Sequence, residues 1–175
     1  MAPHVFVDES KERGYFVAAA VVLPQNLVAS RQAVRALVLP RQRRIHFSSE
    51  RDSRRHQIVD TILNLGARAM IYDATSRPDP KRARDACLTQ LVADLAEIGA
   101  ERLVLEREDA ALHSDNALLY AQVRATGVQR TLRYDHMRAH EEVLLCIPDA
   151  IAWCRARGGH WRTRIQAVVD RVRRV

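Results

Sequence analysis

The hydrophobic and polar positions of this 175-residue chain follow two alternating periodicities. Short apolar or alternating runs favour β-strands, whereas apolar residues spaced by three and four favour helices. On this basis strands are predicted near residues 4–9, 15–23, 67–73 and 102–106, with shorter ones at 45–47 and 131–135. Helices are predicted near residues 25–38, 50–65, 80–98, 110–125 and 141–157, and a basic amphipathic helix at about 161–175.

The spacing of these elements predicts how the strands pair. The first two strands are separated by a short polar turn, which favours an antiparallel hairpin. The later strand, helix, strand order is typical of crossover units with parallel pairing. We therefore expect an α/β fold with a mixed sheet flanked by helices, and a single domain over residues 1–175 because no linker interrupts the pattern.

Two helix starts carry local signals. Asp79 followed by Pro80 is the combination expected of a capping residue and a first helical position. Ser49 with Asp52 three positions later resembles a capping box. Pro148 either kinks the apolar segment around it or starts a second helix there.

Composition restricts the class of protein. Hydrophobic residues make up 47% of the chain while Gly and Pro are few, which predicts a globular fold. No apolar run is long enough to span a bilayer, and the first residues lack the pattern of a secretion signal, so a cytoplasmic protein without membrane association is expected. Three cysteines without a CxxC pair indicate neither a disulfide framework nor a zinc site.

The formal charge is +7, and nearly all of the positive charge is arginine. Eight arginines fall in residues 31–55 and seven in residues 151–175. Codon bias in a GC-rich genome is one explanation, but the clustering favours nucleic acid as a partner, because the guanidinium fork suits phosphate. The basic tail is also compatible with an oligomer contact, so a homodimer is an alternative.

Four acidic residues stand out by position. Asp8, followed by Glu9, ends the first strand, Glu50 opens a helix and Glu106 ends an inner strand. Asp149 lies in an otherwise apolar helix, where a carboxylate is costly unless it is paired, protonated or bound to a metal ion.

Each of these residues also has a simpler interpretation. An acid at a strand end is usually solvated, and an acid in the first turn of a helix often interacts with the helix dipole or caps the helix. Glu106 has arginine neighbours in the sequence with which it can pair. Acids that can replace a member of the set are Glu9, Asp109 and Asp135, the last followed by His136.

The order of these residues resembles the ribonuclease-H-like superfamily, and more closely a bacterial branch of it whose function is unknown. The residues that carry the resemblance are Val7 to Ser10, Ile45 to Ser48, with His46, and Ile147 to Trp153. They match a strand ending in Asp-Glu-Ser, a polar segment with a histidine before the first long helix, and a late helix with an Asp-Ala motif. The resemblance spans residues 4–157.

The chain departs from the pattern of that branch at three places. Lys11 follows the Asp-Glu-Ser motif where glycine is usual, Glu106 stands where aspartate is common, and Pro148 replaces a small residue before Asp149. All three positions bear on the geometry of the acidic residues.

The resemblance implies a metal-dependent nuclease that hydrolyses phosphodiesters of nucleic acid. Asp8, Glu106 and Asp149 would be the ligands of Mg²⁺ or Mn²⁺, which prefer oxygen donors, and Glu50 would be a fourth catalytic carboxylate. Two such ions about 4 Å apart can activate water and stabilise the leaving oxygen. His46 would assist proton transfer, because its ordinary pKa is close to neutrality.

Two other functions compete with this one. The chain can be a non-catalytic module that binds nucleic acid or a partner protein and keeps an eroded ribonuclease-H-like site. An aspartate at a strand end is also the nucleophile of phosphatases, but their second aspartate, two residues later, is here Ser10.

Overall fold

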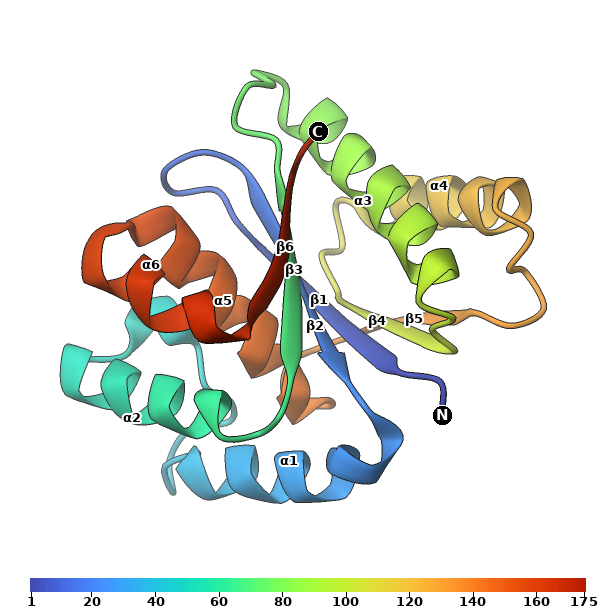
Figure 1. Ribbon diagram of the computed structural model, residues 1–175. Helices are drawn as coiled ribbons and strands as arrows, with labels where there is room; N and C mark the ends of the chain where they lie inside the picture. Colours follow the sequence, from blue (N-terminus) through green and yellow to red (C-terminus); the bar gives the residue numbers. More distant parts are fainter.

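The computed structural model describes residues 1–175 as one mixed sheet of six strands covered by helices on both faces (Figure 1). The strand order is β5-β4-β1-β2-β3-β6. The predicted α/β class, with an N-terminal hairpin followed by parallel strands, is confirmed. The strands are β1 (His4–Ser10), β2 (Phe16–Val22), β3 (Arg68–Asp73), β4 (Arg102–Glu106), β5 (Arg133–Met137) and β6 (Val169–Arg174).

Because β1, β4 and β5 run parallel, their carboxyl ends lie side by side at one end of the sheet. β1 pairs with β2, and β2 with β3, in antiparallel register. β4 is parallel to β1 on one side and to β5 on the other, and β6 is parallel to β3. Val7 is opposite Leu105 in the register, so the next residues, Asp8 in β1 and Glu106 at the end of β4, lie side by side toward the carboxyl ends of these two strands.

The helices form two layers, one on each face of the sheet (Figure 1). One layer holds the first two and the last two helices, and the other holds the middle two. No helix combines the length and apolar composition needed to cross a membrane. The helices are α1 (Pro24–Leu37), α2 (Asp52–Leu63), α5 (Cys146–Arg157) and α6 (Gly159–Ile165) on the first face, and α3 (Pro80–Glu97) and α4 (Leu112–Ala125) on the second.

Each face of the sheet has its own hydrophobic core, because successive side chains of a strand point to opposite faces. Phe6 belongs to the core beneath α5, whereas Val5 and Val7 belong to the core beneath α3. All three side chains are buried, as expected of a strand covered on both sides. The same alternation sends Asp8 toward the α5 face and Glu9 toward the α3 face.

The prediction of a helix over residues 161–175 is wrong beyond Ile165. A short 3-10 turn, η3 (Gln166–Val168), leads into β6, which pairs with β3 along its free edge. Burial in β6 alternates with a period of two: Val169, Arg171 and Arg173 are half-buried, whereas Val172 on the other face is exposed. The helical spacing of these valines is therefore misleading, because pairing with β3 decides the structure of the segment.

The segment between α1 and α2 also differs from expectation. Instead of a strand at 45–47, the chain forms a 3-10 turn, η1 (Phe47–Ser49). A second 3-10 turn, η2 (Val143–Leu145), lies elsewhere in the chain, directly before α5. Phe47 is fully buried, and its ring lies edge-on to Trp153 with centroids 5.3 Å apart. The apolar signal at 45–47 therefore reports a buried anchor rather than a strand.

The two predicted helix starts have different outcomes. The Asp79 side chain accepts a hydrogen bond of 2.8 Å from the backbone N–H of Arg82 and caps α3, as expected. At α2 the capping position is Arg51, which makes no capping bond, so the capping box proposed for Ser49 is absent. Glu50 consequently precedes α2 instead of opening it.

Candidate metal centre

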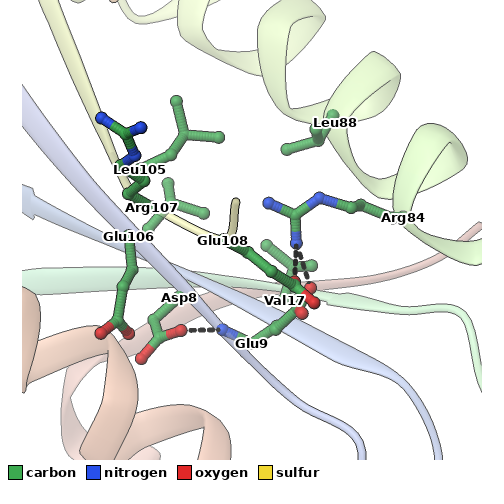
Figure 2. A pocket seen from close by; sticks show the side chains of 10 residues that line it. Asp8, Glu9, Val17, Arg84, Leu88, Leu105, Glu106, Arg107 and Glu108 are labelled. Carbon is green, nitrogen blue, oxygen red and sulfur yellow. Dashed lines mark hydrogen bonds and ion pairs between the residues drawn. The ribbon is translucent and has the colours of Figure 1, made fainter. Parts of the chain in front are cut away.

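Two carboxylates meet where β1 and β4 end on the α5 face of the sheet. Figure 2 shows the Asp8 and Glu106 side chains pointing to the same side, close enough for Glu106 to raise the pKa of the Asp8 carboxyl. Asp8 also accepts a hydrogen bond of 2.7 Å from the backbone N–H of Glu9, through its Oδ1 atom. The parallel register of the two strands therefore positions the first pair of acids.

Asp149 brings a third carboxylate from the first turn of α5, which lies across β1 and β2. Its side chain is largely buried, and its Oδ2 accepts a hydrogen bond of 2.9 Å from the backbone N–H of Phe47. The buried ring of Phe47 thus fixes the turn that orients Asp149. The negative charge of Asp149 is close enough to act on Asp8.

The electrostatics of Asp8 reflect this crowding. Burial raises the pKa of the Asp8 carboxyl well above its ordinary value, and the proximity of Glu106 and the charge of Asp149 raise it further. No lysine or arginine forms an ion pair with Asp8. Such a group is stable when it is protonated or when a cation lies against it.

Two cationic side chains border the acids. Arg44 Nη1 lies 3.5 Å from Glu106 Oε1, so the partner of Glu106 is neither Arg102 nor Arg107. His46 Nδ1 lies 3.8 Å from Asp149 Oδ2.

The Asp149 carboxylate raises the pKa of His46, although partial burial opposes this effect. The imidazole side chain is 51% exposed. It can therefore exchange protons with solvent while it remains beside the acids.

The structure places the fourth predicted acid, Glu50, in a different set of contacts. Glu50 is buried and accepts a hydrogen bond of 2.7 Å from the side chain of Gln42. Arg54 Nε lies 3.4 Å from its other carboxylate oxygen. The contacts of the Glu50 carboxylate are thus with Gln42 and Arg54, and none is with Asp8, Glu106 or Asp149.

The remaining acids considered at the sequence level are neutralised elsewhere. Asp109 pairs with Arg107 at 2.7 Å and with Arg138 at 3.0 Å, and Asp135 lies 3.4 Å from Arg102. Glu9 points to the α3 face. None of these residues replaces a member of the set formed by Asp8, Glu106 and Asp149.

The sequence analysis missed a network of charged residues on the α3 face. Arg84 makes two hydrogen bonds of 2.8 Å to the fully buried carboxylate of Asp115. Its guanidinium also contacts Glu9, as Figure 2 shows. Tyr15 donates to Glu9, and His136 Nε2 lies 3.2 Å from Asp115.

The pKa values of the two acids in this network, Glu9 and Asp115, move in the opposite direction to that of Asp8. Burial alone would raise the pKa of Glu9, but the charge of Arg84 and the contacts with Lys11 and Tyr15 together hold it below its ordinary value. The pKa of Asp115 is likewise low, since Arg84 and His136 outweigh its burial. The available signal was an aspartate, Asp115, at a buried position of the amphipathic helix 112–125.

Comparisons with known proteins give a structural match without a sequence match. No protein family and no curated protein matches the sequence. A solved structure does match, and it is described as the complex of PCNA and RNase HII from Archaeoglobus fulgidus. The match has a TM-score of 0.59 at 12% sequence identity and covers 90% of this chain and 73% of the other. The fold is ribonuclease-H-like.

Within this ribonuclease-H-like fold, the donor chemistry of the three acids suits a divalent cation. Carboxylate oxygens are the ligands that Mg²⁺ and Mn²⁺ prefer, and here they come from β1, β4 and α5. As the side chains stand, no group of three or more histidine, cysteine or acidic residues has the geometry of a ready-made metal site. The unneutralised charge of Asp8 is the feature that fits a cation, because a cation would relieve it.

Proposed function

We propose that this protein is a nuclease that hydrolyses phosphodiesters of nucleic acid with the help of Mg²⁺ or Mn²⁺. The proposed metal ligands are Asp8, Glu106 and Asp149, and the proposed catalytic residues are these three and His46. Glu50, expected as a fourth carboxylate, stays outside the reacting groups in this proposal because Gln42 and Arg54 engage it.

One observation carries the proposal: carboxylates from three separate elements converge on Asp8 without an arginine or lysine to neutralise Asp8. Burying the carboxylate of Asp8 beside two other acids lowers stability, so the arrangement makes sense when a cation is its partner. The ribonuclease-H-like fold and the positive charge of the chain support nucleic acid as the substrate class.

The sequence motifs of the bacterial branch support the same proposal. Asp8 belongs to the strand motif, His46 to the polar segment and Asp149 to the late helix. Although these motifs are far apart in sequence, His46 and Asp149 lie side by side, and Asp149 acts on Asp8. We infer that the chain belongs to that branch.

The roles of the side chains follow from their surroundings. A divalent cation at this place would supply Lewis acidity toward a phosphoryl oxygen and lower the pKa of a bound water. The rigid strands β1 and β4 hold the carboxylates of Asp8 and Glu106 in place, and α5 supplies the third carboxylate, that of Asp149. His46, exposed and beside Asp149, gives a proton to the leaving oxygen of the phosphodiester.

The competing function is a non-catalytic nucleic-acid-binding module. The observation in its favour is the absence of a preformed set of three ligands. Asp8 distinguishes the two functions, because catalysis requires its carboxylate and binding of nucleic acid alone does not.

A cleavage assay tests the proposal. Labelled single-stranded RNA, single-stranded DNA, duplex DNA and an RNA–DNA hybrid are incubated with the protein in Mg²⁺ or in Mn²⁺, with chelator as the blank. We expect metal-dependent cleavage of at least one substrate, and a loss in kcat on the order of a hundredfold or more in Asp8→Asn, Glu106→Gln and Asp149→Asn.

The matched control is Glu97→Gln, which removes an exposed carboxylate at the end of α3, where its ion-pair partner is Arg171. Full activity is expected of this variant. A wild-type protein that cleaves none of the substrates, or cleavage that persists in Asp8→Asn, would contradict the proposed function.

The pH dependence of cleavage tests the role of His46. A group that donates a proton must be protonated. Because the pKa of His46 is raised, the fall in activity with rising pH should occur above the ordinary histidine value of 6.5. His46→Ala should lose this alkaline limb and about 10²-fold or more in kcat. An unchanged profile in this variant would remove His46 from the mechanism.

A further inference from the structure

A basic groove with a volume of about 590 Å³ opens beside Glu106, at the edge of the sheet that carries the three acids. Its volume falls within the range of ligand-binding clefts. The basic residues of this groove are Arg43, Arg44, Arg107, Arg138 and His140. Glu106 and Arg107 also line the pocket drawn in Figure 2, so the groove is continuous with the candidate metal centre.

The basic side chains come from three different segments of the chain. Arg43 and Arg44 lie in the connection between α1 and η1, Arg107 directly follows β4, and the other two follow β5. The backbone N–H of Arg107 donates to the carbonyl of Met137, at 2.9 Å, which ties the last two segments together. Ligands of parallel α/β sheets bind outside the carboxyl ends of the strands, and the groove lies there.

Four arginines line the groove together with two acids, Glu106, which pairs with Arg44, and Glu141, whose Oε1 accepts a hydrogen bond from the backbone N–H of Arg138. Arg107 and Arg138 share one exposed carboxylate, that of Asp109. Arg43 has no acidic partner, and its guanidinium contacts the imidazole of His140, with Nη2 and Nε2 3.2 Å apart. Several guanidinium groups held close together with too little counter-charge form a surface that suits a polyanion.

We propose that this groove binds the sugar-phosphate backbone of a nucleic acid strand, and that Arg43, Arg107 and Arg138 contact its phosphates. The acids at the metal centre repel a phosphodiester, and the adjacent guanidinium groups offset that repulsion and set the direction in which the strand leaves the site. The assignment of the reacting phosphate to the acidic end of the groove rests on the proposed function; the binding of the strand does not.

Binding without metal tests the groove. The affinity of the intact protein for a labelled oligonucleotide, as RNA and as DNA, is measured by fluorescence anisotropy in chelator over a series of salt concentrations. In the triple variant Arg43→Gln, Arg107→Gln and Arg138→Gln, we expect Kd to rise on the order of tenfold or more. The slope of log affinity against log salt should fall by about 2 to 3, since each lost phosphate contact removes about 0.7 to 0.9.

The matched control removes the same charge elsewhere. Arg35, Arg130 and Arg133 are exposed, form no ion pair and lie on α1, in the loop before β5 and at the start of β5. Their triple glutamine variant should keep most of the affinity and most of the slope. Circular dichroism and thermal melts establish that both triple variants are folded.

The outcomes separate this inference from the proposed function. If the groove variant and the control variant bind equally, or if the wild type binds an acidic polypeptide and no oligonucleotide, the groove proposal is overturned even if cleavage occurs. If binding falls in the groove variant while no substrate is cleaved by the wild type, the groove proposal stands and catalysis fails. If both stand, the groove variant should raise KM for cleavage much more than it lowers kcat.

Discussion

Asp8 and Glu9 are adjacent in sequence, and each is a partly buried carboxylate at the same strand end, yet their environments differ in one decisive respect. On the α3 face, Glu9 meets Arg84 and Tyr15, and its pKa is lowered. On the α5 face, Asp8 meets Glu106 and Asp149, and its pKa is raised. The difference lies in the supply of positive charge and not in the extent of burial.

The comparison shows why a cluster of buried acids is not by itself a candidate site. Glu9 and Asp115 share a guanidinium and form a satisfied network, which stabilises the packing of α3 and α4 on the sheet. The acids on the other face are left with a bordering arginine, Arg44, and a histidine, His46. A face that keeps uncompensated negative charge is one where a cation is expected.

The largest effect on stability is expected from removal of Arg84, the arginine that pairs with the acids on the α3 face. Arg84→Met removes the guanidinium from the fully buried Asp115, which keeps only His136, and from Glu9, which keeps Lys11 and Tyr15, so the free energy of unfolding should fall by about 3–5 kcal/mol. The control is Arg82→Met, an exposed arginine on the same helix whose side chain makes no ion pair, for which a change within about 0.5 kcal/mol is expected. Chemical denaturation measures both, and equal losses would show that Arg84 has no special role.

Neutralising substitutions at the two adjacent acids should have opposite signs. Asp8→Asn relieves repulsion, and in chelator at neutral pH it should raise the free energy of unfolding on the order of 1 kcal/mol. Glu9→Gln weakens the contacts with Arg84 and should lower it by about 1–3 kcal/mol. Thermal melts of the two variants beside the wild type make the comparison, and changes of the same sign would contradict it.

The pH dependence of stability sharpens the same contrast with a smaller effect. Because the pKa of Asp8 is raised in the folded state, its contribution to the free energy of unfolding is fully present below pH 3.8, the ordinary aspartate value. This contribution is lost as the pH rises through the folded pKa. Because the pKa of Glu9 is lowered in the folded state, its contribution to the free energy of unfolding is fully present above pH 4.5, the ordinary glutamate value. This contribution is lost as the pH falls through the folded pKa.

The advantage of Asp8→Asn and the deficit of Glu9→Gln should therefore both shrink toward acid pH and widen toward neutrality. Denaturation curves collected in chelator across that range measure the two differences. A gap between the variants that stays constant with pH would mean that neither carboxyl titrates as described.

Much of the fold could be predicted from local pattern. The hairpin, the crossover strands and the start of α3 at Asp79 and Pro80 depend on periodicity and turn residues, which are local properties. The tail could not be predicted, because the same valines fit a helix in isolation and a strand once the edge of β3 is available. Tertiary pairing decided between the two.

The candidate site was accessible to a similar degree. The positions of Asp8, Glu106 and Asp149 at element ends or in an apolar helix singled them out, and the structure brings them together. Glu50 satisfies the same local criteria but is bound by Gln42 and Arg54, which depends on how α1 and α2 pack. Counter-charge is a property of the folded state, and the sequence pattern does not report it.

The central claim is that the uncompensated acids hold a divalent cation, and a crystal of the protein soaked in Mn²⁺ tests it most directly. Anomalous scattering is expected to show an ion bound by oxygens of Asp8, Glu106 and Asp149, and no ion on the α3 face beside Glu9 and Arg84. An ion bound elsewhere, or no ion at all, would contradict the account.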